Sequence, residues 1–277
     1  MDSVLYTLPE TVQEQNDVVA YYYIELPRET DVLKKAGTLA VGQTIGTWIP
    51  VPGITDEIRE KYMGRVVNVF DVPSVDLEPQ VTEETQKYII QIAYPAVHFG
   101  GDFPLLLTSL LGNDASTSAQ VKLLDIIFPK EYAQEFSGPR FGIQGIREYL
   151  GIWDRPVLLN MIKPCTGLTP EEGAKIFYQV ALGGIDLIKD DELLGDPAYS
   201  RPEERVKAYR KAAEAAAEVT GERVKYFVNV TSGSSRIMEN VKRAVDAGAD
   251  GIMVNFATAG YSTLKQIAEA AGVPVLG

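Results

Sequence analysis

The sequence predicts an α/β protein with two parts, a mixed α+β domain over residues 1–150 and a run of strand-helix units over residues 151–277. Two observations predict this division. In the first part, short runs rich in β-branched and aromatic residues alternate irregularly with helical patterns. In the second part, apolar strands and amphipathic helices alternate regularly, which is typical of a parallel sheet covered by helices.

Five expected strands and two expected helices make up the first part. The strands cover residues 18–26, 46–51, 65–73, 87–99 and 121–129, and the helices cover residues 29–43 and 102–113. Each strand carries β-branched or aromatic residues, and each helix carries apolar residues at helical spacing. This mixture indicates an α+β domain.

Five expected strands alternate with four expected helices in the second part. The strands cover residues 156–163, 185–189, 225–230, 251–255 and 273–277, and the helices cover residues 169–184, 201–221, 234–248 and 261–272. Thr169, Pro170 and Glu172 form the signal of a capped helix start with proline at the first helical position. A (β/α)8 barrel and an open doubly wound sheet both satisfy this pattern.

The composition limits the classes of partner. With 38 acidic and 26 basic residues, the 277-residue chain has a net charge of −12, which argues against nucleic acid or an anionic membrane as the main partner. No apolar run approaches the roughly 20 residues of a membrane span. The single cysteine, Cys165, cannot form an internal disulfide, and the first residues lack a secretory signal. We therefore expect a cytoplasmic protein.

Polar residues close four successive strands of the second part, and in both candidate architectures ligands bind at these strand ends. They are Lys163, Lys189 with Asp191 and Glu192, Asn229, and Asn255. The alternative is that these side chains are simply hydrated where the strands meet solvent. Their recurrence on one rim favours a single polar site.

The acidic cluster permits metal chemistry. Adjacent carboxylates are stabilised by a cation, and oxygen ligands without histidines favour Mg²⁺ over zinc. Lys189 could be an ion-pair partner, an attacking amine or, after reaction with CO₂, a carbamate ligand. Lys163 could transfer a proton to or from a metal-bound carbonyl compound, and we expect burial near positive charge to lower its pKa. The only histidine, His98, lies far off in the first part.

Several motifs resemble the large-chain RuBisCO superfamily. They are "GPRFGIQGIREYLGIWDRPVLLNMIKPCTGLTP", "GGIDLIKDDE", "YFVNVTSGS" and "IMVNFATAGYSTL" in the second part, with "GTW" at 46–48 and "LLGN" at 110–113 in the first. The resemblance implies an N-terminal α+β (ferredoxin-like) domain followed by a parallel (β/α)8-type barrel, of which only about the first half is present.

The resemblance also implies roles for individual residues. Lys189, carbamylated by CO₂, would bind Mg²⁺ together with Asp191 and Glu192, and Lys163 would serve in enolisation. The residues that the N-terminal domain of a neighbouring subunit brings to the substrate match Thr47, Trp48 and Asn113. A homodimer or a higher oligomer of dimers is therefore expected, with Asn229 and Asn255 as further substrate contacts.

Three departures separate the chain from true carboxylases. Carboxylases have a second lysine two residues after the one that matches Lys163, and this chain has Cys165 there. Gly42 stands where they have a glutamate, and "VNFATAG" at 254–260 stands where they have a segment with a His-Asp pair. These changes resemble RuBisCO-like (form IV) proteins. We therefore expect an enolase, isomerase or decarboxylase acting on a phosphorylated ketose or sugar acid. A true ribulose-1,5-bisphosphate carboxylase and a non-catalytic truncated scaffold are the alternatives.

The length of the second part sets a further expectation. From residue 157 to residue 277 there are 277 − 157 + 1 = 121 residues, whereas a (β/α)8 barrel typically needs about 250. We therefore expect a fragment or a split gene product that ends inside or just after its fifth strand. A natural half barrel that dimerises is the alternative.

Overall fold

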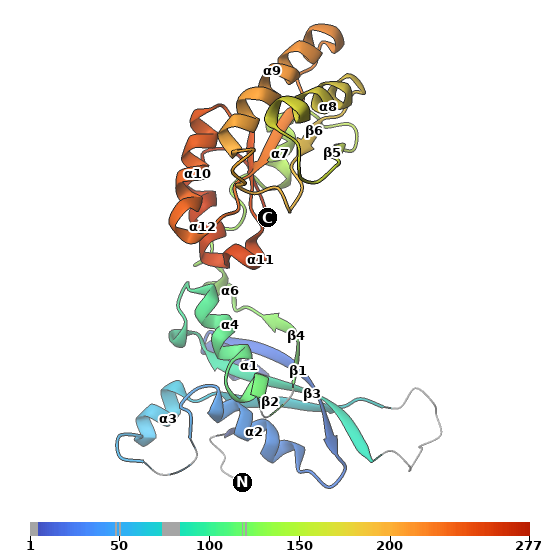
Figure 1. Cartoon of the computed structure of the whole chain (residues 1–277). Coiled ribbons are helices and arrows are strands. Elements are labelled where there is room, and N and C mark those ends of the chain that lie inside the picture. The colour runs from blue at the N-terminus through green and yellow to red at the C-terminus, as the bar shows by residue number, and fades with distance from the viewer. Residues whose placement is uncertain (1–4, 48, 50, 74–83, 118, 120) are drawn as a thin grey trace. The chain divides into compact units, whose positions relative to one another are not determined.

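The structure is a computed structural model of the chain, and it describes residues 5–47, 49, 51–73, 84–117, 119 and 121–277. The chain divides into two compact units, residues 1–137 and 138–277 (Figure 1). The division falls before the helix at residues 142–150, whereas the texture of the sequence placed it near residue 150. Among the residues that the structure describes, no helix is long and apolar enough to cross a lipid bilayer.

The first unit is built on a four-stranded antiparallel sheet in the order β2-β3-β1-β4. β1 pairs with β3 along its whole length. The strands are β1 (Asp17–Pro27), β2 (Arg65–Asp71), β3 (Thr85–Pro95) and β4 (Lys122–Ile127). The helices are α1 (Pro9–Glu14), α2 (Val32–Gly42), α3 (Asp56–Tyr62), α4 (Phe103–Leu111), α5 (Asp114–Thr117) and α6 (Lys130–Ala133), with a 3₁₀ turn over Ala96–His98. The expected α+β character of this part is confirmed.

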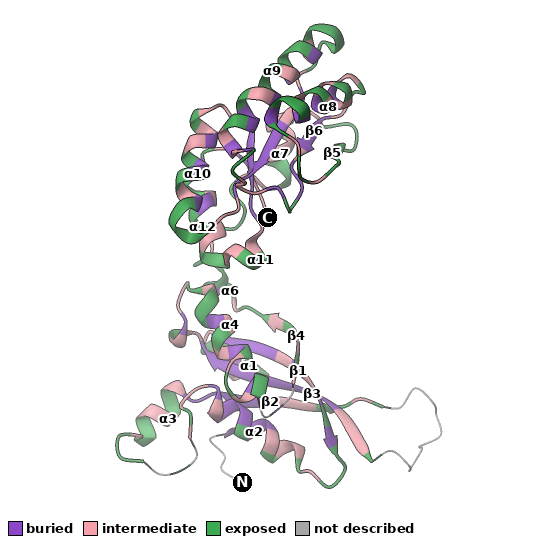
Figure 2. Ribbon diagram, in the orientation of Figure 1, coloured by how far each residue is buried: buried purple, intermediate pink, exposed green. Residues whose placement is uncertain are grey.

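The core of the first unit lies on one face of this sheet. The β1 residues Ala20, Tyr22 and Ile24 are buried, as the two-residue period of a strand requires, and Figure 2 shows the burial along β1 and β3. The Tyr22 hydroxyl donates to the Leu110 carbonyl oxygen at 2.8 Å and lies 3.1 Å from the Tyr94 hydroxyl. Burying these phenols costs little because each polar atom has a partner.

The strand expected at residues 46–51 does not form in the described part of that segment, residues 46, 47, 49 and 51. The carbonyl oxygen of Val41 accepts hydrogen bonds from the amides of Thr44 and Gly46, and Gly46 has a φ of +85°. The chain therefore turns at the end of α2, in a conformation that suits glycine and interrupts a strand. Tertiary context overrides the β propensity of the segment.

The second unit contains a five-stranded parallel sheet in the order β5-β6-β7-β8-β9. The strands are β5 (Leu159–Met161), β6 (Leu187–Lys189), β7 (Lys225–Asn229), β8 (Gly251–Met253) and β9 (Val275–Leu276). The helices are α7 (Gly142–Leu150), α8 (Pro170–Leu182), α9 (Pro202–Thr220), α10 (Ser234–Asp246), α11 (Phe256–Ala259) and α12 (Tyr261–Ala270).

The order of the strands decides between the two architectures that the sequence left open. Each strand pairs with the strand that follows it along the chain, whereas a doubly wound sheet reverses its order at a switch point. Sequential order is the order of a (β/α)8 barrel. The second unit is therefore consistent with a partial barrel.

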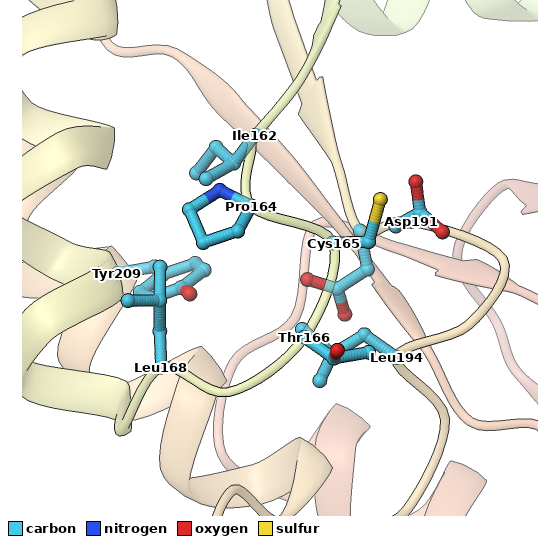
Figure 3. A pocket seen from close by; sticks show the side chains of 9 residues that line it. Ile162, Pro164, Cys165, Thr166, Leu168, Asp191, Leu194 and Tyr209 are labelled. Carbon is cyan, nitrogen blue, oxygen red and sulfur yellow. The ribbon is translucent and has the colours of Figure 1, made fainter.

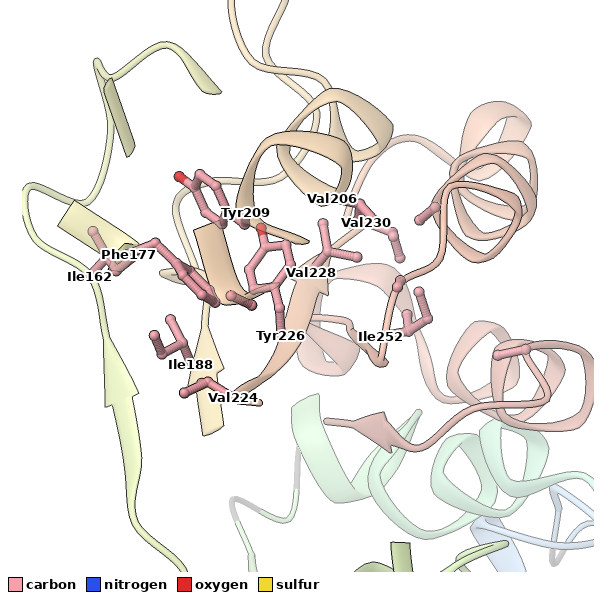
Figure 4. Close-up of a cluster of buried hydrophobic side chains, with 14 of the residues drawn as sticks. Ile162, Phe177, Ile188, Val206, Tyr209, Val224, Tyr226, Val228, Val230 and Ile252 are labelled. Atoms are coloured by element: carbon pink, nitrogen blue, oxygen red, sulfur yellow. The ribbon is translucent and has the colours of Figure 1, made fainter. Parts of the chain in front are cut away.

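The helices cover the sheet through a continuous apolar core. Figure 4 shows this core, which includes Ile188 and Val228 from the strands and Val206 from α9. The rings of Phe177, Tyr209 and Tyr226 meet at its centre, with centroids 4.8 to 5.7 Å apart. These rings join α8 and α9 to β7, beneath the strand ends that carry the polar residues.

The start of α8 is capped as the sequence predicts. The Thr169 hydroxyl oxygen accepts a hydrogen bond from the Glu172 amide at 3.3 Å, and the Glu172 carboxylate accepts one from the Thr169 amide at 2.9 Å. Pro170 occupies the first helical position. This reciprocal arrangement satisfies two amides that the helix itself leaves unpaired.

Two aspartates hold the opposite, amino-terminal ends of the strands. Asp186, before β6, makes two 2.7 Å bonds with the guanidinium of Arg155 and accepts the amide of Leu158 at 2.7 Å. Asp250, before β8, pairs likewise with Arg223 and accepts the amide of Tyr226. Each carboxylate therefore connects its own strand to the preceding strand of the sheet.

Candidate active site at the strand ends

Four of the expected site residues lie together at the carboxyl edge of the parallel sheet. Lys163 follows β5 by two residues, and Lys189 ends β6 and is followed by Asp191 and Glu192. Lys163 Nζ lies 2.7 Å from Asp191 Oδ2, and Lys189 Nζ lies 2.6 Å from Glu192 Oε1. Two lysines and two carboxylates therefore form one charged cluster, built from the ends of two neighbouring strands.

The two ion pairs differ in their exposure. The Asp191 side chain is 7% exposed and its partner Lys163 is 56% exposed, whereas the Lys189 side chain is 13% exposed and its partner Glu192 is 56% exposed. Each pair thus contains one group held inside the protein and one group open to solvent. A small molecule approaching the cluster would meet Lys163 and Glu192 first.

The hydrogen bonds of the cluster shift the pKa values of its carboxyls downward. The ammonium of Lys163 and the amide of Leu193 lower the pKa of Asp191 to about 2, and Lys189 lowers the pKa of Glu192. Both carboxyls are therefore ionised near neutral pH. Ionised oxygens are what a hard divalent cation requires.

The pKa of Lys163 moves opposite to the sequence expectation. We expected burial near positive charge to lower it, but the Lys163 side chain is largely exposed and faces an aspartate. The Asp191 carboxylate, followed by the Cys165 thiol whose Sγ lies 2.8 Å from Lys163 Nζ, raises the pKa of Lys163. An opposite charge at this distance favours the protonated amine.

Two asparagines at the strand ends hold the backbone of the loop after β6, which carries Asp191 and Glu192. The Asn229 side chain is fully buried and donates to the carbonyl oxygens of Asp191 at 3.1 Å and Glu192 at 3.2 Å. The Asn255 amide donates to the Glu192 carbonyl oxygen at 2.7 Å. Asn229 therefore supports the backbone that carries both carboxylates, and its expected contact with a substrate stays a prediction.

Asn255 keeps one group available. Its side-chain Oδ1 is buried and has no hydrogen-bond partner among the described residues, while its Nδ2 is bonded to the loop. A buried acceptor of this kind is normally satisfied by water or a ligand. The expected contact between Asn255 and a substrate stays a prediction.

The remaining expected site residues belong to the first unit. The Thr47 hydroxyl accepts the amide of Ile49 at 3.1 Å, and Asn113 is exposed and donates to the Gly42 carbonyl oxygen at 3.2 Å. Trp48 lies outside the described residues. A substrate contact by these residues from a neighbouring subunit stays a prediction.

The absence of a side chain at position 42 matters for the segment around Asn113. A Cβ added to Gly42 would lie 2.2 Å from Asp114 Oδ2. The glutamate found here in carboxylases would therefore displace Asp114, so the two positions are coupled in this chain.

A small pocket opens beside the charged cluster, between the loop after β5 and the loop after β6 (Figure 3). Cys165 and Thr166 line it from the first loop, Asp191 and Leu194 from the second, and Tyr209 from α9. The Cys165 position, which a second lysine fills in carboxylases, thus faces a partly apolar recess. This removes a positive charge next to Lys163 and leaves Asp191 as its nearest charged partner.

Sequence reasoning missed two residues beneath the cluster. Asp190 and Arg205 are both buried and form an ion pair with an Arg205 Nη2 to Asp190 Oδ2 distance of 3.1 Å. The available signal was an arginine in the first turn of a helix, where the macrodipole disfavours a cation.

The donor set fits Mg²⁺ if Lys189 is carbamylated. Among the described residues, no group of three or more His, Cys, Asp and Glu side chains is arranged to hold a metal ion. Asp191 and Glu192 supply two carboxylates on adjacent residues, and a carbamate on Lys189 would supply a third oxygen ligand beside them. An all-oxygen set is what Mg²⁺ prefers.

Comparison with known proteins identifies the family. Residues 6–132 match the ribulose bisphosphate carboxylase large chain, N-terminal domain, and residues 142–273 match the catalytic domain of the same chain. The protein therefore belongs to the RuBisCO large-chain family, as the motifs predicted.

Its relatives include proteins that carry RuBisCO-like names. The chain is 40% identical over 268 residues to a ribulose bisphosphate carboxylase-like protein of Archaeoglobus fulgidus, covering 97% of this chain and 61% of the relative. It is 37% identical over 253 residues to a 2,3-diketo-5-methylthiopentyl-1-phosphate enolase of Geobacillus thermodenitrificans, covering 91% and 60%. The chain thus spans about three fifths of the length of these relatives.

Solved structures give the same answer for the fold. A rubisco-like protein (MtnW) from Alicyclobacillus acidocaldarius superposes with a TM-score of 0.83 at 34% identity, covering 94% of this chain and 63% of that one. A dimeric archaeal Rubisco from Hyperthermus butylicus superposes with a TM-score of 0.82 at 33% identity, covering 94% and 60%. Both the fold class and the family are therefore confirmed.

Proposed function

We propose that this chain carries the metal-binding part of a RuBisCO-like enzyme that moves a proton at the carbon next to the carbonyl of a phosphorylated ketose or sugar acid. The observation that carries the proposal is the cluster of Lys163, Lys189, Asp191 and Glu192 at one edge of the parallel sheet. The enolase name of the Geobacillus thermodenitrificans relative supports the reaction class.

Lys189 has the setting of a carbamate ligand. Its amine, once neutral, would attack CO₂, forming an N–C bond and releasing one proton. The product oxygens would lie beside Glu192, whose carboxylate now sits 2.6 Å from Nζ. Asp191, Glu192 and this carbamate would then hold Mg²⁺, which would polarise a substrate carbonyl and stabilise negative charge on its oxygen.

Lys163 is the group placed to move the proton. It is the more exposed of the two lysines of the cluster, and among the described residues it forms an ion pair with Asp191. Because Asp191 favours the protonated form of Lys163, this group can give a proton to the carbon beside a bound carbonyl, and it can take one from that carbon once it has lost its own. Asn255 Oδ1 is buried and has no hydrogen-bond partner among the described residues, and it would accept a substrate hydroxyl only if the Asn255 side chain moved.

The departures favour proton transfer over carboxylation. Cys165 leaves Lys163 without a neighbouring lysine, and Asp114 fills the space beside Gly42 where carboxylases place a glutamate. We infer that the chemistry ends with movement of the proton or loss of a fragment. Assembly as a homodimer would bring Thr47, Trp48 and Asn113 to the site, and the dimeric Rubisco of Hyperthermus butylicus supports this arrangement.

The first experiment measures Mg²⁺ binding by calorimetry with and without CO₂. We expect the wild-type chain to bind Mg²⁺ only with CO₂ present, and Lys189→Ala to bind in neither condition. Binding that does not depend on CO₂ or on Lys189 would refute the carbamate site.

A second experiment tests the role of Lys163. Lys163→Met should bind Mg²⁺ as the wild type does and lose exchange of the substrate's α-proton with deuterated water. Lys175→Met, at an exposed lysine of α8, is the matched control and should keep both properties. Exchange that survives in Lys163→Met would disprove the assignment, and incorporation of labelled CO₂ into ribulose bisphosphate would instead establish a carboxylase.

A further inference from the structure

The buried arginine Arg205 is the most constrained cation in the described part of the chain. It lies in the first turn of α9 and its side chain has no exposed surface. A cation there is opposed by the helix macrodipole and by the loss of its hydration. Other contacts must therefore compensate the cost of burying this charge, and they come from residues outside the helix.

The contacts of Arg205 converge on the loop after β6. Nε donates to Asp190 Oδ2 at 3.1 Å, and Nη2 donates to carbonyl oxygens at 2.8 to 3.1 Å. The carbonyl partners of Nη2 are Leu194, Gly195 and Asn229, and Nη1 donates to the Ser200 carbonyl oxygen. The guanidinium thus joins both ends of the segment 190–200 to the end of β7.

Asp190 connects this guanidinium to the charged cluster. It stands between Lys189 and Asp191 in the chain, and its carboxylate also accepts the Tyr226 hydroxyl at 2.6 Å and the Asn229 amide at 2.9 Å. Three hydrogen bonds, one of them from the guanidinium of Arg205, therefore fix the position of the Asp190 carboxylate.

Asn229 completes the frame from the other side. Its backbone amide is bound by Asp190 and its carbonyl oxygen by Arg205, while its side chain holds the carbonyls of Asp191 and Glu192. A shift of the buried pair is therefore transmitted to the backbone that carries both carboxylates. The hydrogen bonds of Arg205 to the described residues go to Asp190 and to backbone carbonyl oxygens, not to the side chains of the cluster.

We propose that Arg205 is the positioning residue of the strand-end site, holding the loop 190–200 so that Asp191 and Glu192 stand side by side as ligands. The part of this inference that concerns metal rests on the proposed function. The part that concerns the loop does not. Groups behind metal ligands typically change affinity by about 10- to 100-fold when they are altered.

The test compares Arg205→Met and Arg205→Lys with the wild type by amide hydrogen exchange and by Mg²⁺ calorimetry in the presence of CO₂. In Arg205→Met we expect exchange in segment 190–200 to become at least about tenfold faster and Mg²⁺ affinity to fall by about 10- to 100-fold. Arg205→Lys keeps the charge but loses the fork of donors, and should fall between the two.

Arg223→Met is the matched control, because it removes another arginine–aspartate pair from the same sheet at its opposite edge. It should lower thermal stability without changing exchange in segment 190–200 or Mg²⁺ affinity. If Arg205→Met does not fold, the double variant Asp190→Asn/Arg205→Met replaces it, since no unpaired buried charge then remains.

The outcomes separate the two hypotheses. Unchanged loop exchange in a folded Arg205 variant, or equal loop exchange in Arg205→Met and Arg223→Met, overturns the positioning role. Faster loop exchange together with no Mg²⁺ binding by the wild-type chain supports the positioning role and refutes the proposed metal site.

Discussion

Replacing Gly173 with alanine tests how α8 and α9 pack beneath the site. A Cβ at this position would lie 2.0 Å from the Tyr209 hydroxyl oxygen, 2.8 Å from its Cζ and 3.0 Å from its Cε1. Ordinary contact needs about 3.4 Å or more, so the hydroxyl must move by roughly 1.4 Å. Helix propensity alone would make the substitution stabilising by about 1 kcal/mol.

Tyr209 has little room to move. Its ring is buried and lies 5.2 Å from the ring of Phe177 and 4.8 Å from the ring of Tyr226 between centroids. Forcing an extra methyl into such a core costs about 1–3 kcal/mol. After the gain in helix propensity is subtracted, we expect Gly173→Ala to lose up to about 2 kcal/mol of net stability, a fall in Tm of up to about 8 °C for a chain of this size.

Thermal unfolding followed by circular dichroism measures this change. The double variant Gly173→Ala/Tyr209→Phe removes the clashing oxygen and should recover part of the loss, although the ring carbon at 2.8 Å keeps some strain. Gln179→Ala, at an exposed position of α8, is the control for helix propensity. A Gly173→Ala variant as stable as the wild type, or more stable, would refute the packing argument.

Three further predictions concern stability. Burial raises the pKa of Asp17 from 3.8 to about 6. The folded protein is therefore favoured at low pH, and this contribution to its stability is lost as the pH rises through 6. Between about pH 4.5 and pH 8 the wild type should lose about 2 kcal/mol that Asp17→Asn keeps, as measured by urea unfolding; equal pH dependence in both would contradict this. Thr169→Ala removes the cap of α8 and should cost about 1 kcal/mol, whereas the exposed Thr258→Ala should cost less; equal unfolding midpoints would exclude the cap's contribution. Asp186→Asn leaves Arg155 without its carboxylate partner and should cost about 1–3 kcal/mol of stability. The loss should be smaller at acidic pH, because protonation of Asp186 weakens the pair in the wild type. A loss that does not vary with pH would disprove the charge effect.

Most of the helices and strands were predictable from local chemistry. The β-branched and aromatic residues of β1 and the capping signal of Thr169 depend on neighbours in the sequence, so the strand and the helix start were predictable from it. The strand predicted for residues 46–51 was wrong, because the amides of Thr44 and Gly46 donate to the Val41 carbonyl oxygen and turn the chain there. A turn of that kind depends on where α2 ends. The β-branched residues of segment 46–51 do not reveal that position.

For the site, the sequence by itself determined which residues reach the strand ends, because a parallel sheet places all its carboxyl ends on one edge. It did not determine what each of them does there. Only the tertiary structure showed that Asn229 supports the loop, that Asp191 raises the pKa of Lys163, and that Arg205 lies behind the carboxylates. These features arise from contacts between residues up to dozens of positions apart, and burial, which decides the cost of each charge, exists only in the folded chain.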